Sequence, residues 1–280
     1  MRLGLGFCAL GLMAALSATP GAAQENQCLT EAVGILRAAH PEAVPVDDSA
    51  DLYRIGDQQL RISRDRSVFT QHPVMVCRYW PGRPGTLLVA IPLIDQDLEG
   101  SNVALTGDVE LYAMEASSWQ IEARLLLPDF IQSDAINFDR IYFDTAHYDL
   151  VDGRRAFGLR SDYTGASRVN PYSRTDLSLF DLHEGKLSLI LADLVVAQSN
   201  GEWDGNCTGE HDHTGRVLDV GPGTYNSASD IRVLTQVSHD SSRDTGDDCT
   251  TTTTETDLPE TVLKYNGLHY PVPEDLAAPW

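Results

Sequence analysis

One short stretch of this sequence combines residue types and a spacing that suit a metal ion. Asp204, Asn206, Thr208 and Asp212 carry side-chain oxygen atoms at the first, third, fifth and ninth positions of the stretch, and Gly209 takes the sixth. Calcium binds six to eight hard oxygen ligands, and a glycine at a tight bend lets a loop direct several side chains inward. The spacing therefore predicts a calcium site.

The surroundings of this stretch leave other interpretations open. A disulfide at Cys207 would make it a solvated acidic loop without any ion. His211 and His213 would share one face of a strand, and His239 is a candidate third ligand for zinc. A second acidic group follows His239 and is either a solvated loop or one side of a shared cation site; it consists of Asp240, Asp244, Asp247 and Asp248.

Glu202 and Trp203 stand directly before the stretch. They form a candidate binding motif, or Trp203 simply anchors the loop beside Cys207. The nucleophile elbow of hydrolases, the zinc-protease helix motif and the phosphate-binding glycine loop are all absent from the sequence. We therefore assign no catalytic residue and no cofactor and leave calcium open as a bound ion, and 41 acidic residues leave a hydrolase with paired carboxylates open.

The first 23 residues have the layout of a secretory signal peptide. Arg2 is followed by an apolar run over residues 3–16 and by small residues up to Ala23, where we expect cleavage. The apolar run is shorter than the roughly 20 residues that a membrane-spanning helix needs. We predict a periplasmic or secreted protein that does not insert into a membrane.

Four cysteines follow the signal peptide, and an oxidising compartment favours disulfides. Four cysteines allow three pairings. We favour Cys28 with Cys77 and Cys207 with Cys249, because each of these pairs is local to one end of the chain. The chain-entropy model gives roughly 4 kcal/mol of stabilisation for each such loop.

The formal net charge of −21 limits the classes of partner. Nucleic-acid phosphates and anionic lipid surfaces repel a protein of this charge, whereas cations and basic proteins are attracted to it. We therefore expect no nucleic-acid partner. A plainer explanation of the charge is solubility.

The pattern of apolar residues predicts one helix and many strands. Apolar residues recur at steps of three and four over residues 27–39, with Asn26 as the expected cap and Pro41 just past the end. Apolar or alternating stretches at residues 86–93, 119–127, 155–159 and 231–237 read as strands.

A short repeat indicates hairpins. An apolar-aromatic pair at residues 52–53, 111–112 and 179–180 is followed, eight positions after its first member, by Leu60, Trp119 and Leu187. We expect a strand, a polar turn of four residues and a second strand in each case. Asn266 and Gly267 predict a tighter hairpin over residues 264–270 with a type I′ turn.

The chain after the signal peptide, residues 24–280, is expected to form a single β-rich domain. We predict an all-β, mainly antiparallel fold, either propeller-like or a meander of hairpins, with one N-terminal helix. A sub-boundary near residue 200 would fall in the acidic stretch 198–215, which reads as a long loop. The threonine tract 250–254 reads as an exposed strand.

Several phrases together resemble a family of exported proteobacterial proteins with no assigned activity. They lie at residues 76–81, 87–90, 143–148, 155–160 and 201–207. The resemblance implies export and an all-β body, and it provides no activity to transfer. Our preferred function is a non-catalytic exported protein that presents disulfide-tethered acidic loops to a ligand or cationic protein. The alternatives are a calcium-stabilised structural module and a hydrolase of envelope polymers that uses paired carboxylates or a metal.

Overall fold

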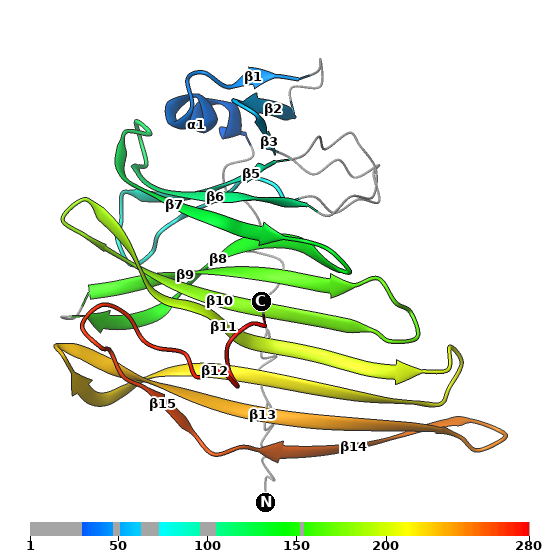
Figure 1. The fold of residues 1–280 in the computed structure, drawn as a ribbon. Coiled ribbons are helices and arrows are strands. Elements are labelled where there is room, and N and C mark those ends of the chain that lie inside the picture. Colours follow the sequence, from blue (N-terminus) through cyan, green and yellow to red (C-terminus); the bar gives the residue numbers. More distant parts are fainter. Residues whose placement is uncertain (1–29, 47–50, 63–72, 96–104, 152–153, 280) are drawn as a thin grey trace, which may run out of the picture.

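The computed structural model describes residues 30–46, 51–62, 73–95, 105–151 and 154–279. These residues form two antiparallel sheets and one helix, stacked along one axis of the molecule (Figure 1). The predicted all-β fold with an N-terminal helix is confirmed, and its strands follow one another mostly as hairpins of a meander. In the described part of the chain no helix is long and apolar enough to cross a membrane.

The first sheet has the order β1-β2-β3-β5-β6-β7, and β4 pairs with β5. Its strands are β1 (Val44–Pro45), β2 (Leu52–Ile55), β3 (Gln58–Arg61), β4 (Val76–Tyr79), β5 (Thr86–Ile94), β6 (Thr106–Glu115) and β7 (Ile121–Gln132).

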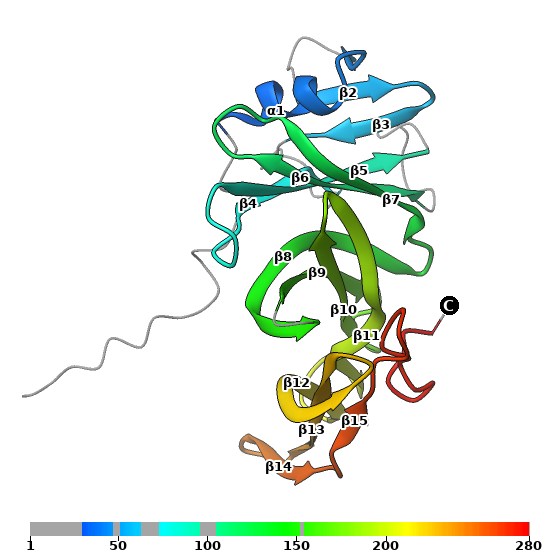
Figure 2. The same cartoon turned by 90° about the vertical axis from the view of Figure 1, so that its left-hand side faces the viewer.

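The second sheet has the order β12-β11-β10-β9-β8-β13-β14, with β15 against β13. Its strands are β8 (Ile136–Val151), β9 (Arg154–Gly165), β10 (Tyr172–His183), β11 (Lys186–Trp203), β12 (Gly209–Tyr225), β13 (Ala228–Asp244), β14 (Cys249–Asp257) and β15 (Thr261–Leu263). Because β13 pairs with both β12 and β8, the strands from β8 to β13 close on themselves, as the end-on view in Figure 2 shows.

Helix α1 (Ala32–Ala39) covers the outer face of the first sheet. Its buried residues Ala32, Ile35 and Leu36 share a core cluster with residues of β2, β3, β5 and β6. A Cβ atom at Gly34 would lie 2.4 Å from the ring of Trp119, so the glycine lets this ring pack directly on the helix. The helix ends at Ala39, as predicted, but it begins at Ala32 with Glu31 as its N-cap, so the predicted start at residue 27 and the cap at Asn26 are wrong. Residues 26–29 lie outside the described residues.

A second core fills the space between the two sheets. Leu88 and Leu111 from the first sheet pack in one cluster with Phe157 and Phe180 from the second. Trp80 is 4% exposed, and its ring meets Phe157 edge to face at 5.2 Å between centroids. Trp80 is therefore a core residue rather than a ligand-stacking one, and the two sheets share one hydrophobic interior.

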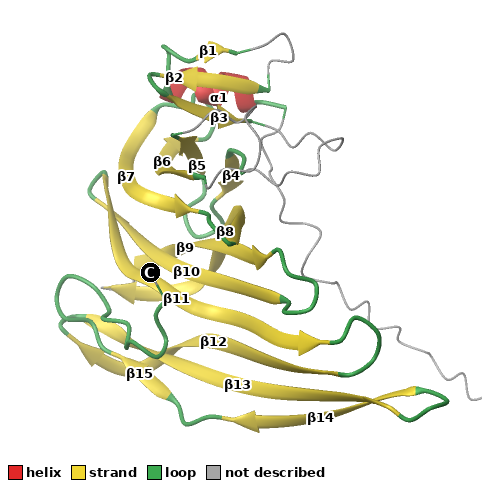
Figure 3. Cartoon of the chain, turned by 45° about the vertical axis from the view of Figure 1, so that its right-hand side comes forward, coloured by secondary structure: helices red, strands yellow, loops and turns green. Residues whose placement is uncertain are grey.

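A third core lies within the closed second sheet, and the segment after β15 seals it (Figure 3). Tyr270 donates a backbone hydrogen bond to Ile190 of β11, and Val195 donates one to Leu276. The side chains of Tyr270 and Leu276 are buried in this core. The segment thus occupies the edge of β11 that β12 does not reach.

The three predicted hairpins all exist, but two have shorter turns than expected. Gly56 and Asp57 alone join β2 to β3, and Glu184 and Gly185 alone join β10 to β11. Glu184 and Gly185 both have positive φ values, 49° and 72°, as the tight turn of a hairpin requires. The strand predicted over residues 119–127 begins only at Ile121, because Trp119 lies in the turn with φ 59°.

The predicted hairpin over residues 264–270 does not form. The side-chain Oδ1 of Asn266 accepts the backbone N–H groups of Leu268 and His269, both at 2.9 Å. This local turn replaces the expected type I′ turn, and no strand follows β15 among the described residues. The chain instead continues to the edge of β11.

The long loop predicted over residues 198–215 is also wrong. Strand β11 continues to Trp203 and β12 starts at Gly209, so only residues 204–208 form a turn. The sub-boundary considered near residue 200 falls inside β11. Here both faces of the sheet are largely exposed, and the period-two apolar pattern that marks a half-buried strand is missing. The tract 250–254 is an exposed strand as predicted, and every residue of β14 is exposed.

Candidate functional site

The candidate site of the sequence analysis lies at one end of the second sheet. We call residues 200–213 and 238–255 the acidic sheet end. This region contains nine Asp and Glu residues but only one Arg. It is formed by the tips of two long hairpins, β11-β12 and β13-β14, which extend beyond the packed cores (Figure 3).

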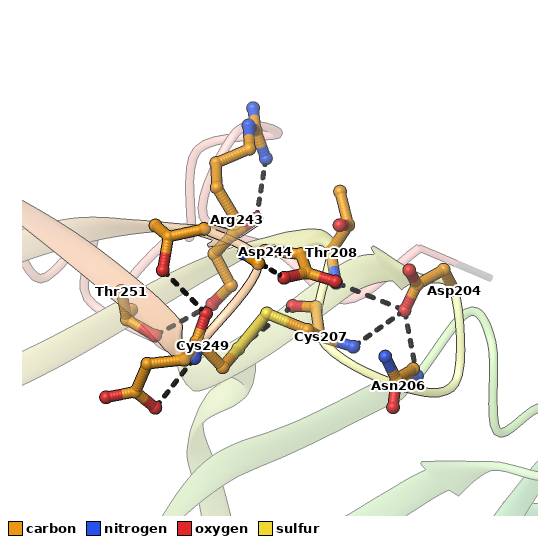
Figure 4. Close-up of a disulfide and its surroundings, with 12 residues drawn as sticks. Asp204, Asn206, Cys207, Thr208, Arg243, Asp244, Cys249 and Thr251 are labelled. Atoms are coloured by element: carbon orange, nitrogen blue, oxygen red, sulfur yellow. Dashed lines mark hydrogen bonds between the residues drawn. A yellow bond between two sulfur atoms is a disulfide. The ribbon is translucent and has the colours of Figure 1, made fainter.

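A disulfide joins the two hairpin tips (Figure 4). Cys207 in the β11-β12 turn bonds to Cys249 at the start of β14, with 5.7 Å between their Cα atoms. This pairing was predicted and is confirmed. Cys77 is disulfide-bonded as well, whereas Cys28 lies outside the described residues. The bond holds the two acidic turns side by side.

Asp204 organises the first turn (Figure 4). Its Oδ1 accepts backbone N–H groups from Asn206, Cys207 and Thr208 at 2.8, 2.9 and 3.1 Å. These hydrogen bonds, chiefly that from Asn206, hold the pKa of Asp204 below its usual range. The carboxylate therefore stabilises its own turn by accepting hydrogen bonds from the backbone.

The second turn is organised in the same way. Gly246 donates its N–H to Asp244 Oδ1 at 2.7 Å, and Cys249 donates to Asp248 Oδ1 at 2.8 Å. Thr245 contacts the carbonyl oxygen of Asp248 through both its N–H and its hydroxyl group. Two of the four residues of the second acidic group thus stabilise a turn, and Asp240 lies within β13.

The four predicted calcium ligands are distributed over a turn and a strand. Asp212 lies in β12, three residues beyond Gly209 and opposite Asn200 and His239. At about 3.3 Å per residue, Asp212 is about 10 Å along the strand from the turn of Asp204. Asp204 accepts hydrogen bonds from its own turn and Asp212 contacts His239, so the two carboxylates have different partners. Across the described ranges, no three His, Cys, Asp or Glu side chains are placed to hold a metal ion.

One face of the acidic sheet end is an exposed ion-pair network. His239 contacts Asp212 Oδ1 at 2.8 Å through Nδ1 and Glu210 Oε2 at 2.7 Å through Nε2. Arg243 donates to the other oxygen of Glu210. Hydrogen bonding to Asp212 is the main reason that the pKa of His239 is raised, and Arg243 is the main reason that the pKa of Glu210 is lowered.

The other face of the acidic sheet end carries His211 and His213. His211 and His213 lie with their rings nearly parallel, 6.4 Å apart, and His213 is 3.4 Å from a carboxylate oxygen of Asp240. The register pairs His239 with Asp212, so its side chain points to the opposite face. The zinc set of three histidines is therefore not assembled.

A shallow hollow of about 310 Å³ lies on this second face. Its sides are formed by small polar side chains that the register aligns across four strands, namely Ser173, Ser199, His213 and Ser238. Gly215 in the next row leaves the hollow open, since a Cβ atom there would meet nothing within 4 Å. The face is hollow enough to receive a side chain of a partner.

Glu202 and Trp203 have different roles. Glu202 is exposed and lies opposite Glu210, which adds a second negative charge at that position. Trp203 is partly buried and covers Gly209, where a Cβ atom would lie 3.0 Å from its ring. Trp203 thus anchors the turn beside Cys207, and only Glu202 remains available for binding.

The sequence analysis did not single out Glu210 and Arg243, which contact each other and complete the network around His239. The alternation of side chains along a strand could have found them. Residues 210 and 212 of β12 lie on the same face of the sheet as residues 239, 241 and 243 of β13, since residue 210 pairs with 241 and residue 212 with 239. That argument requires the strands that we took for a loop.

A separate cluster of titratable side chains is buried under helix α1. Glu110 accepts hydrogen bonds from Tyr112 at 2.5 Å and from Arg124, and it contacts His40 Nε2 at 2.6 Å. Although burial opposes ionisation, these three partners lower the pKa of Glu110 to about 2. Every oxygen of this carboxylate is used within the protein, which is typical of a structural role.

Comparisons with protein-family models, with curated proteins and with solved structures found no match to this chain. The function is therefore argued from the site alone.

Proposed function

We propose that this protein is a non-catalytic binding protein that acts in the periplasm or outside the cell and presents its acidic sheet end to a cationic protein. Nine carboxylates against one arginine, held on two hairpins that a disulfide joins, are the observation that carries the proposal. Export rests on the layout of residues 1–23 and on the disulfide, since such bonds persist in oxidising compartments.

The geometry suits binding more than catalysis. The carboxylates lie on exposed turns and on both faces of a sheet rather than in a groove. The Cys207–Cys249 bond and the backbone hydrogen bonds to Asp204 and Asp244 hold the turns in one arrangement before a partner arrives. Preorganisation of this kind reduces the ordering cost of association. Complementary charge raises the association rate more than the final affinity.

Association kinetics with a cationic protein test the proposal. Lysozyme serves as the probe, and its binding to the full chain is measured at ionic strengths from low to high. We expect the association rate constant to fall steeply with salt while the dissociation rate changes little. An association rate that does not depend on salt, or no association at all, overturns the proposal.

A double variant that neutralises two acidic side chains tests where the contact lies. Glu202→Gln and Asp247→Asn remove charge from side chains for which the structure shows no hydrogen bond, and together they should lower the association rate several-fold. The matched control, Asp57→Asn with Glu184→Gln, removes the same charge from exposed turns elsewhere and should leave the rate nearly unchanged. Equal losses in the two double variants would show that net charge, and not this surface, attracts the probe.

A further inference from the structure

A cavity of about 340 Å³ lies between β7 and the second sheet. Its walls are mainly apolar on the side of β7 and polar on the side of β10 and β11. The lining residues are Leu127, Pro128, Asp129, Phe130, Gln132, Tyr163, Ser178, Leu189 and Asp193. Enclosed apolar space with a few convergent polar groups is the usual form of a small-molecule site.

A row of buried polar side chains on β10 reaches this cavity at Ser178. Arg174, Asp176 and Ser178 alternate along the strand and therefore point to the same face, where Phe180 continues into the core between the sheets. All three are buried, with 5%, 1% and 3% of their surface exposed. Ser178 lines the cavity, whereas Asp176 lies two residues before it on the same face of β10 and is not part of the lining.

The carboxylate of Asp176 lacks the partners that buried charges normally have. Its Oδ2 accepts one hydrogen bond, from Arg174 Nε at 3.1 Å. Its Oδ1 is buried and has no hydrogen-bond partner anywhere in the described part of the chain. Burial raises the pKa of Asp176 to about 7. Buried acceptors in native proteins are almost always satisfied, so this oxygen is an exception among the buried polar atoms of β10.

Two carboxylates, Asp129 and Asp193, line the cavity. The Oδ1 of Asp193 accepts the hydroxyl group of Ser178 at 3.2 Å, and burial raises the pKa of Asp193. Arg174 contacts Asp176 and lies over the ring of Tyr163 at 4.4 Å. The polar side of the cavity thus offers acceptors with negative charge.

The backbone at the cavity is shaped for this arrangement. Asp129 and Asp193, on opposite walls, both have left-handed conformations, with φ of 52° and 50°. Asp129 lies in an irregularity of β7, where its N–H binds Asp108 Oδ1 at 2.9 Å. Such conformations are uncommon outside glycine and cluster at ligand sites.

We propose that this cavity binds a small organic amine, whose apolar body packs against Leu127, Phe130 and Leu189 while its ammonium group donates to Asp193. The apolar walls favour an organic cation over a metal ion, which would need more oxygen ligands. The two carboxylates exclude organic anions. This site is separate from the acidic sheet end.

Calorimetry with three compounds of similar shape tests the proposal on the full chain. Benzylammonium supplies the cation, benzyl alcohol a neutral counterpart and benzoate an anion. We expect saturable binding and a raised melting temperature with benzylammonium, at least tenfold weaker binding of benzyl alcohol and no binding of benzoate. Comparable binding of all three, or no saturable binding of benzylammonium at millimolar concentration, overturns the proposal.

Variants place the ligand in the cavity. Asp193→Asn keeps an acceptor for Ser178 and tolerates a positive φ, and it should weaken benzylammonium binding at least tenfold. Leu189→Trp fills the cavity from a position that is 38% exposed, leaves every charge in place and should weaken binding equally. Asp247→Asn, the control, removes a charge at the acidic sheet end and should change binding less than twofold. Wild-type affinity in both cavity variants, with melting temperatures near that of the wild type, contradicts the assignment.

Discussion

Glu110 and Asp176 are two carboxylates at nearly the same depth, 3% and 1% exposed, with opposite electrostatic properties. Glu110 contacts His40, Tyr112 and Arg124, and its pKa falls to about 2. Asp176 accepts a single hydrogen bond, from Arg174, and its pKa rises to about 7. The comparison teaches that the number of donors, and not burial itself, decides whether the pKa of a buried acid falls or rises.

Replacing Glu110 gives the largest expected effect. Glu110→Gln removes the charge that His40 and Arg124 share, and we expect a loss of about 3 kcal/mol in the free energy of unfolding, measured in urea at pH 7. Glu42→Gln is the matched control, because Glu42 contacts the other ring nitrogen of the same histidine from the surface. It should cost less than about 1 kcal/mol. Equal losses would remove the distinction between the two partners.

The pH dependence of stability separates the two carboxylates. The folded pKa of Asp176 is raised, so the folded state binds more protons than the unfolded chain between about pH 4 and pH 7, and this group costs stability as the pH rises. Its neighbours are Arg174 on β10, Tyr163 and Asp162 on β9, and Asp193 on β11. Between pH 5 and pH 8 the wild type should lose about 2 to 3 kcal/mol more than Asp176→Asn. The opposite holds for Glu110, whose contribution is present above pH 4.5 and is lost as the pH falls toward 2. Parallel pH profiles for the wild type and Asp176→Asn contradict the prediction.

Asp204 extends the comparison to an exposed carboxylate with three backbone donors. Asp204→Ala should lower the melting temperature, because the N–H groups of the β11-β12 turn lose their acceptor. Glu202→Ala in the same hairpin should leave the melting temperature unchanged. Equal melting temperatures for the two variants would contradict this role of Asp204.

Calcium is expected to have the smallest effect. A ligand at 100 times its dissociation constant stabilises by about 2.7 kcal/mol, so a calcium site would appear in a melting curve. Because Asp204 accepts hydrogen bonds from its own turn and Asp212 contacts His239, we expect the same melting temperature with chelator and with added calcium. A rise with calcium that a chelator reverses would revive the calcium-stabilised module.

Local signals in the sequence were sufficient for much of the fold. The apolar spacing predicted the end of helix α1 at Ala39, and the aromatic repeats predicted three hairpins. The pairing of Cys207 with Cys249 followed from their being neighbours along the chain. The helix and the hairpins depend on contacts between residues close in sequence, and the disulfide joins two cysteines that follow each other in the order of cysteines along the chain.

The failures have a common physical cause. Strands β11 and β12 extend into solvent, where backbone pairing needs no apolar alternation, so residues 198–215 read as a loop. The face to which His239 points depends on register, which spacing alone does not fix. Asp176 and Asp193 stood among 41 acidic residues, and only tertiary packing distinguishes them, because it buries Asp176 and places Asp193 in the wall of a cavity.

The segment that seals β11 makes completion of this fold a late event. A chain synthesised only as far as residue 265 would leave an unpaired β11 edge and an open third core, because the backbone partners of Ile190 and Asp193 are Tyr270 and Ala278. The fold is therefore incomplete until residues 270–278 have paired with β11. Clipping this segment from the finished protein should create an edge that recruits strands from other molecules.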